Sequence, residues 1–228
     1  MVVLNILVEG STEEAFVKNI LRPHLKLRGL NINTKYSLVP TNRSKSIGGG
    51  VANYAKVKNE INRLLKERNS QPVILTTMFD LYALPNDFPE FEQSNKILDP
   101  CLKVKALESA FAIDINHYRF IPYIQLHEFE ALIFTDLEEL YKDFPENDQY
   151  KKDINCLLME CNKYSSPELI NQGVTTAPSK RLEKVIPKYK KLKTSLAPQV
   201  VEKIGLVKIR EKCPHFNQWI TQLENLQI

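Results

Sequence analysis

Residues 2–14 read Val2-Val3-Leu4-Asn5-Ile6-Leu7-Val8-Glu9-Gly10-Ser11-Thr12-Glu13-Glu14, and this stretch decides the fold class. The apolar run 2–8 does not alternate with polar residues, which is typical of a strand buried on both faces. Ser11, with Glu14 three residues later, predicts a capping box that starts a helix. The unit of strand, glycine turn and helix places Glu9 at the edge of a sheet, where ligands bind in open α/β folds.

Strand and helix patterns alternate through the first 135 residues. After the helix from Ser11 to about Gly29 we expect strands and helices in the order 31–39, 54–68, 73–79, 101–111, 118–126 and 128–134. This order predicts an α/β fold with a mostly parallel central sheet of about four strands, flanked by helices. From residue 136 strand signals nearly vanish. We therefore expect an α/β domain over residues 1–135 and a helical C-terminal extension over 136–228, packed on the sheet.

The composition is that of a globular protein with one substantial core. The chain has 228 residues, 43% of them hydrophobic, and its net charge of +4 permits contact with nucleic acid without requiring it. No apolar stretch is long enough to span a bilayer, and residues 1–4 lack the basic segment of a signal peptide. We expect a cytoplasmic protein with no membrane association. The four scattered cysteines favour thiols buried in helices over a zinc site.

Acidic residues follow the ends of three predicted strands. Glu9 follows the first, Asp80 follows residues 73–79, and Glu128 with Glu130 follows residues 123–127. Carboxylates are ligands that Mg²⁺ prefers, and a bound metal assists phosphodiester cleavage by orienting a water and lowering its pKa. We predict Glu9, Asp80 and Glu128 as ligands of Mg²⁺ or Mn²⁺, with Glu9 as ligand or general base.

Other interpretations of these acids stay open. Glu13, a further candidate ligand, is explained equally well by the favourable position of an acid in the first turn of a helix. Asp80 also suits a loop cap. Glu128 and Glu130 lie two apart on a predicted helix and point to different sides, so we prefer Glu128.

His127 and several basic residues are the remaining site candidates. His127 lies beside these acids in the sequence. It is interpreted as a catalytic general acid, as a hydrogen-bond donor in the outer shell of the site, or as a structural histidine. Lys180 and Arg181 follow a loop rich in hydroxyl groups that runs into a helix start, a suitable place for phosphate or nucleic acid. Arg43 and Lys45, near the three glycines 48–50, form a second candidate. The basic run 188–193 is expected to be a solvated helix face.

These residues resemble the Toprim group of metal-dependent phosphotransfer domains, in which a Glu-Gly follows the first strand and an Asp-x-Asp follows a later one. Glu13 matches a second acid of the overcoming-lysogenization-defect nucleases. The whole chain is similar to a bacterial family of small stand-alone Toprim-like proteins. The segments that carry this resemblance are Val8-Glu9-Gly10-x-Thr12-Glu13-Glu14, Thr77-Met78-Phe79-Asp80-Leu81-Tyr82-x-Leu84-Pro85, His127-Glu128-Phe129-Glu130-Ala131-Leu132 and Ala177-Pro178-Ser179-Lys180-Arg181.

The resemblance implies a Toprim-like fold and a magnesium-dependent nuclease that acts on nucleic acid, with DNA as the expected substrate. It also implies an ATPase partner and a role in defence against phage. The chain departs from the pattern at Tyr82, which stands where the second Asp is expected, so Glu128, Asp87 or Glu13 must complete the site. A non-catalytic recognition or regulatory subunit is the alternative, and action on a small phosphorylated molecule is a third. A homo-oligomer is compatible with the sequence.

Overall fold

The computed structural model describes residues 2–27, 32–38, 53–67, 71–145, 147–171 and 173–226, without the side chains of residues 32–38 and 174. The chain forms two compact units, residues 1–125 with 222–228 and residues 126–221. The predicted boundary after residue 135 falls inside the second of these units.

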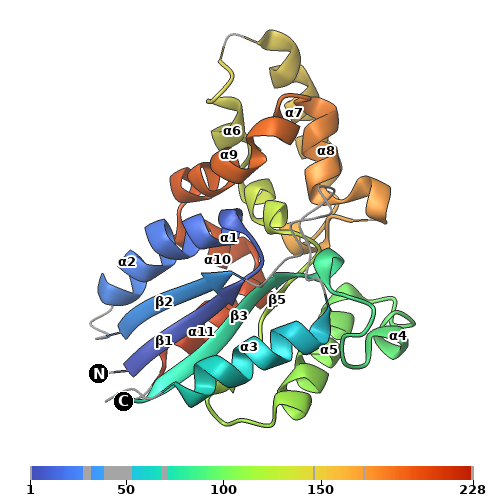
Figure 1. Ribbon diagram of the computed structural model, residues 1–228. Coiled ribbons are helices and arrows are strands. Elements are labelled where there is room, and N and C mark those ends of the chain that lie inside the picture. Colours follow the sequence, from blue (N-terminus) through green and yellow to red (C-terminus); the bar gives the residue numbers. More distant parts are fainter. Residues whose placement is uncertain are drawn as a thin grey trace. The chain divides into compact units, whose positions relative to one another are not determined.

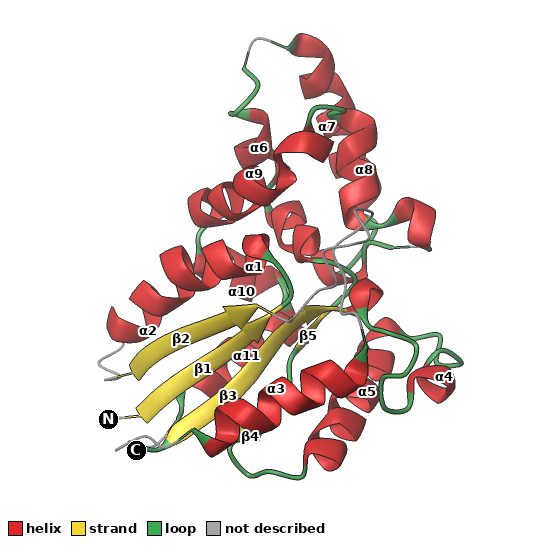
Figure 2. Ribbon diagram, in the orientation of Figure 1, coloured by secondary structure: helices red, strands yellow, loops and turns green. Residues whose placement is uncertain are grey.

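The first unit is built on a parallel sheet, as predicted. Its strands are β1 (Val2–Val8), β2 (Ile32–Leu38), β3 (Val73–Asp80), β4 (Phe120–Ile121) and β5 (Ile124–Gln125). Their order is β2-β1-β3-β4, with β5 also paired to β3, and every pair is parallel. Figure 2 shows β1, β2 and β3 pointing the same way. The carboxyl ends of β1 and β3 therefore lie at one edge of the sheet.

Helices cover this sheet. They are α1 (Ser11–Phe16), which continues through a π-helical turn (Val17–Leu21) into α2 (Arg22–Leu27), then α3 (Tyr54–Lys66), α4 (Phe91–Ser94) and α5 (Pro100–Ile115). Figure 1 shows α3 lying across one face of the sheet. All seven residues of β1 are buried, which explains why its sequence does not alternate.

An aromatic cluster forms part of the core of the first unit. The ring of Phe111, on α5, lies with its centroid 4.8 Å from that of Phe120 and 4.9 Å from that of Phe88. Tyr54, at the start of α3, packs edge-on against Phe111 at 5.8 Å and donates a hydrogen bond to Asp114. Burial of the Asp114 carboxyl opposes its ionisation, but hydrogen bonds from Tyr54 and Lys58 and the Lys58 charge lower its pKa overall.

The predicted strand 118–126 is two short strands instead. The break occurs at Pro122 and Tyr123, between β4 and β5. Proline cannot donate to a ladder. The backbone of Tyr123 forms hydrogen bonds with a side chain in place of a strand. Its N–H donates to Thr77 Oγ1 at 2.9 Å, and its carbonyl accepts from the same hydroxyl at 3.0 Å. The Thr77 hydroxyl thus replaces ladder hydrogen bonds at this position.

The second unit is helical. Its elements are η3 (Phe129–Thr135), α6 (Leu137–Tyr141), α7 (Asp148–Cys161), η4 (Pro167–Leu169), η5 (Val174–Thr176), α8 (Pro178–Val185), α9 (Tyr189–Ile204), α10 (Leu206–Lys212) and α11 (Pro214–Glu224), whose end belongs to the first unit. The predicted helix 128–134 is the 3₁₀ segment η3, and all of its residues are buried. It contacts α6, α8, α9 and α10, so η3 is central to the packing of this unit.

The cysteines are free thiols. Burial raises the pKa of Cys161 to about 12 and also raises the pKa of Cys213, so both remain protonated. Cys156 is exposed on α7, where the sequence predicted a buried thiol.

Candidate active site

The structure brings Glu9 and Asp80 together at the carboxyl edge of the sheet. Glu9 directly follows β1 and Asp80 ends β3, and these strands are parallel neighbours in which Val8 pairs with Met78. The backbone N–H of Asp80 donates to Glu9 Oε2 across 3.3 Å. Both residues are half-buried. Two carboxylate residues from distant parts of the sequence therefore lie side by side.

Glu13 lies next in the chain after the Glu9-Gly10 turn, and its carboxylate forms a hydrogen bond within the turn. Gly10, not Ser11, is the N-cap of α1, so the predicted Ser11–Glu14 capping box is wrong by one residue. Glu13 is the third helical residue, and its Oε2 accepts the Gly10 N–H at 2.9 Å. The Glu13 side chain is buried, with 6% of the residue exposed. Glu9, Glu13 and Asp80 are called the acidic edge below.

Gly10 permits this close approach. A Cβ atom at Gly10 would lie 3.2 Å from Glu13 Oε2, so the carboxylate would have to move by a few tenths of an ångström. A larger residue at position 10 would therefore press on the Glu13 carboxylate that caps α1.

The donor set of the acidic edge suits a magnesium site with few protein ligands. Mg²⁺ is commonly held by one or two carboxylates together with water and substrate phosphates, and Glu9 and Asp80 offer two. Within the described ranges, no three His, Cys, Asp or Glu side chains are arranged to hold a metal ion. Asp87 serves another purpose, because both of its oxygens accept the Tyr54 N–H, at 3.0 and 3.1 Å.

Glu128 and His127 belong to the second unit. Glu128 Oε2 accepts the backbone N–H of Ser179 at 2.9 Å, so its carboxylate lies at the N-terminus of α8. His127 is 4% exposed and has a φ of 61°, a left-handed conformation that histidine adopts more readily than most residues. Its Nδ1 lies 3.3 Å from Asn171 Nδ2. This buried, anchored ring is placed to shape the loop that carries Glu128.

Glu130 points into the core of the second unit. It is 5% exposed, and its Oε1 accepts the hydroxyl of Tyr189 at 3.3 Å. Burial, followed by the charge of Glu130, raises the pKa of Tyr189 well above its ordinary value, so the phenol keeps its proton and donates.

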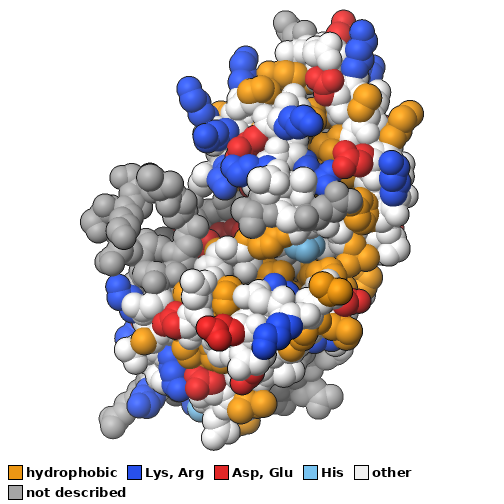
Figure 3. All heavy atoms as spheres, turned by 90° about the vertical axis from the view of Figure 1, so that its right-hand side faces the viewer, with side chains coloured by type: hydrophobic (Ala, Val, Ile, Leu, Met, Phe, Trp, Pro, Cys, Tyr) orange, Lys and Arg blue, Asp and Glu red, His pale blue; other side chains and the backbone are white. Residues whose placement is uncertain are grey.

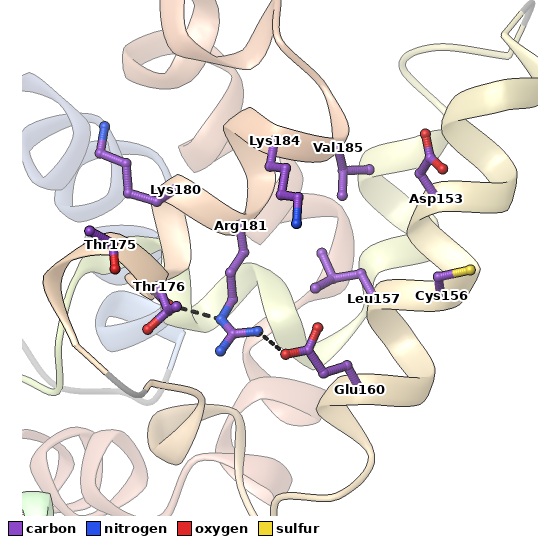
Figure 4. Close-up of a pocket in the computed structure, with 10 residues that line it drawn as sticks. All are labelled: Asp153, Cys156, Leu157, Glu160, Thr175, Thr176, Lys180, Arg181, Lys184 and Val185. Atoms are coloured by element: carbon purple, nitrogen blue, oxygen red, sulfur yellow. Dashed lines mark hydrogen bonds and ion pairs between the residues drawn. The ribbon is translucent and has the colours of Figure 1, made fainter.

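Lys180 and Arg181 adopt different environments on α8. Arg181 is buried: its Nε donates to the Thr176 carbonyl at 2.8 Å and its Nη1 to Glu160 at 2.5 Å. Lys180 is exposed and pairs with Glu183 at 2.8 Å. Figure 4 shows the Arg181 guanidinium between Thr176 and Glu160, with Lys180 directed elsewhere. Arg181 therefore joins α8 to α7, a role that the sequence did not reveal.

A cavity of about 480 Å³ lies between α7 and α8. Lys180, Arg181 and Lys184 contribute positive charge to its lining, while Asp153 and Glu160 contribute negative charge. In Figure 4, Lys184 extends into the space between the two helices. The position of Lys184 at this cavity was not predicted from the sequence.

Arg43 and Lys45, the other predicted phosphate contacts, lie outside the described residues, as does the glycine cluster 48–50. On the face drawn in Figure 3, basic and acidic side chains are interspersed. Several basic residues of the second unit are ion-paired, for example Lys203 with Asp143 and Lys208 with Asp136, each at 2.5 Å.

Residues 8–224 match the model of DUF4276, a domain of unknown function. The chain belongs to the DUF4276 family. The DUF4276 match begins at the last residue of β1 and ends at the last residue of α11, so it covers both units and every candidate residue of the site. No match was found among curated proteins or among solved structures.

The DUF4276 chain shows no helix, among those that the structure describes, that is long and apolar enough to cross a bilayer.

Proposed function

We propose that this DUF4276 protein is a metal-dependent nuclease of the Toprim type that hydrolyses phosphodiester bonds in the cytoplasm, with Mg²⁺ or Mn²⁺ as its cofactor. The observation that carries the proposal is the contact between Glu9 and Asp80 at the carboxyl ends of β1 and β3. Ligand sites of open α/β sheets lie at this edge. The resemblance of the Glu9-Gly10 and Asp80 segments to Toprim motifs points to the same chemistry.

In this mechanism Glu9 and Asp80 would hold the metal ion through carboxylate oxygens. When bound, a divalent ion lowers the pKa of a water molecule and neutralises charge on the scissile phosphate. Glu9 would act either as such a ligand or as the general base that accepts the proton of the attacking water. Glu13 keeps the Glu9-Gly10 turn in position through its bond to Gly10 N. His127 acts on the position of the Glu128 loop, and Glu128 is a further candidate ligand.

Lys180 and Lys184 are proposed to hold the nucleic-acid backbone. Both line the cavity between α7 and α8 and belong to the exposed residues of α8. Arg181 holds α8, which carries both lysines, against α7 through its ion pair with Glu160. Contacts of this kind bind phosphates without reading sequence, so binding should weaken as salt is added.

Glu9→Gln is the decisive test of the nuclease. Glutamine keeps the size of the side chain and an oxygen that can accept the Asp80 N–H, but it removes the negative charge. We expect cleavage of DNA in the presence of Mg²⁺ or Mn²⁺ to fall by at least about a hundredfold. Glu14→Gln, in the same turn but with no role in the mechanism, is the matched control. Cleavage by Glu9→Gln at the wild-type rate would refute the proposal.

The partner proposed from the resemblance is an ATPase, and the proposed setting is defence of a bacterium against phage. ATP-dependent stimulation of cleavage by an ATPase encoded beside the chain would support this part. If ATP and the ATPase do not stimulate cleavage, the protein is a nuclease that acts alone.

A non-catalytic recognition or regulatory subunit is the second candidate function. It is favoured by the backbone bonds of Glu13 and Glu128, which direct one oxygen of each carboxylate to a helix start, and by Tyr82 at the place of the second acid. Calorimetric titration with Mn²⁺ separates the two candidates. Saturable binding that Asp80→Asn removes supports the nuclease, whereas no binding and no cleavage support the subunit.

A further inference from the structure

The outer side of α5 exposes two large apolar residues, Leu102 and Ile113, beside Lys105 and Ser109. The inner face of this helix carries Val104, Leu107, Phe111 and Ile115, all buried. On the outside, however, Leu102 is 57% exposed and Ile113 is 77% exposed, and the flanking Leu98 and Tyr118 are 98% and 91% exposed. Large apolar side chains that are exposed together mark candidate interaction surfaces.

The outer residues of α5 have the spacing of a helix-pairing seam. Leu102, Ala106, Ser109 and Ile113 are separated by four, three and four residues, the spacing of the a and d positions of a heptad. At 100° per residue they fall within a narrow stripe. Large side chains lie at both ends of the stripe and small ones in the middle, which lets two helices approach closely.

This order of sizes is symmetric about the midpoint of the helix, between residues 107 and 108. In an antiparallel pair of α5 helices related by a two-fold axis there, Leu102 faces Ile113 of the second copy and Ala106 faces Ser109 of the second copy. An interface about a two-fold axis requires this reciprocity, in which residue i meets residue j and j meets i. The partner that matches the stripe is therefore the same stripe.

We propose that α5 docks against α5 of a second copy of this chain, in an antiparallel helix pair. The exposed area agrees with such a dimer. With about 150–200 Å² for each fully exposed large side chain, Leu102 and Ile113, together with Leu98 and Tyr118 just beyond the ends of the helix, present roughly 500–650 Å². Two copies that bury all of this area bury about 1,000–1,300 Å², which is at the lower limit for specific interfaces. The dimer is independent of the acidic edge and of the proposed nuclease activity.

Sedimentation equilibrium of the full chain across a dilution series tests the proposal. We expect a reversible monomer–dimer equilibrium for the wild type. Leu102→Asp and Ile113→Asp each place a charge in the seam twice per dimer and should raise the dissociation constant at least about a hundredfold. Val207→Asp, at an equally exposed apolar residue of α10 (73%), is the control and should leave the constant unchanged. Circular dichroism checks that each variant is folded.

A charge-pair rescue tests the antiparallel register. Leu102→Asp and Ile113→Lys should each weaken the dimer alone. Combined in one chain, they place opposite charges face to face across the two-fold axis and should restore at least part of the affinity. A wild type that is monomeric throughout the series, a dimer that both aspartate variants leave intact, or a double variant no tighter than the single ones would overturn the proposal.

Discussion

Replacing Glu13 separates a structural role of this residue from a metal-binding one. The Glu13 carboxylate is 6% exposed and accepts the Gly10 N–H at 2.9 Å, at the start of α1. A hydrogen bond to a charged group contributes about 1.5–3 kcal/mol, and Glu13→Ala leaves the Gly10 N–H without this acceptor. We expect Glu13→Ala to lower the free energy of unfolding by about 2 kcal/mol, or the melting temperature by roughly 4–8 °C for a chain of this length.

Glu13→Gln keeps an oxygen for the Gly10 N–H and loses only the charge, so we expect about half of that destabilisation. Glu14→Ala, one residue along the same turn, is the control for helix propensity and should change stability by less than about 0.5 kcal/mol. Thermal melts followed by circular dichroism measure all three variants. Equal stability of Glu13→Ala and wild type would refute the capping role. If Glu13→Gln melts as predicted but loses Mn²⁺ binding in calorimetry, Glu13 is also a ligand.

Three further changes test other features of the structure. Asn5 is 2% exposed in β1, and neither polar atom of its side chain has a hydrogen-bond partner among the described residues. The isosteric change Asn5→Leu should therefore raise the melting temperature by several degrees. A lower melting temperature would contradict the conclusion that the Asn5 amide is buried without hydrogen bonds. Arg181→Ala should lower the free energy of unfolding in urea by about 1–3 kcal/mol, because it removes two hydrogen bonds of a buried guanidinium. Lys180→Ala, at an exposed ion pair, should lower it by less than about 0.5 kcal/mol. The pKa of Asp114 is lower in the folded chain, so its contribution is present above the unfolded value of 3.8 and is lost as the pH falls through the folded value. The stability difference between wild type and Asp114→Asn should therefore shrink on acidification, and a constant difference would be evidence against the shift.

The sheet was predictable because its signals are local. A continuous apolar run such as residues 2–8 has few alternatives to a doubly buried strand, and alternation of such runs with helical patterns implies parallel pairing. The second half of the strand predicted at 118–126 was not predictable in the same way. Pro122 is a local signal for the break, but the conformation of the chain at Tyr123 depends on the hydroxyl of Thr77, which is distant in sequence and meets the Tyr123 backbone only in the folded chain.

The contact between Glu9 and Asp80 was predictable from the fold, since both follow strands that the pattern made parallel. The partners of Glu13, Glu128 and Arg181 were not. Each is bound to a backbone amide, a carbonyl or an acid whose position depends on helix starts and packing. A sequence shows which residues are ionisable but does not show which backbone groups remain for them to bind.

These hydrogen bonds make Glu9 and Asp80 the leading candidates for ligands of the metal ion. Glu13, Glu128 and Glu168 each accept backbone N–H groups at the start of a helix, so this chain repeatedly uses carboxylates to satisfy helix N-termini. Glu9 differs because the backbone N–H that it accepts is that of Asp80, at the end of a strand and not at a helix start. An ion held by two carboxylates keeps most of its coordination positions for water and phosphate oxygens. Its affinity should then rise when nucleic acid is added, and by linkage nucleic acid should bind more tightly in the presence of Mg²⁺. Metal and substrate that bind independently of each other would be incompatible with a site of this kind.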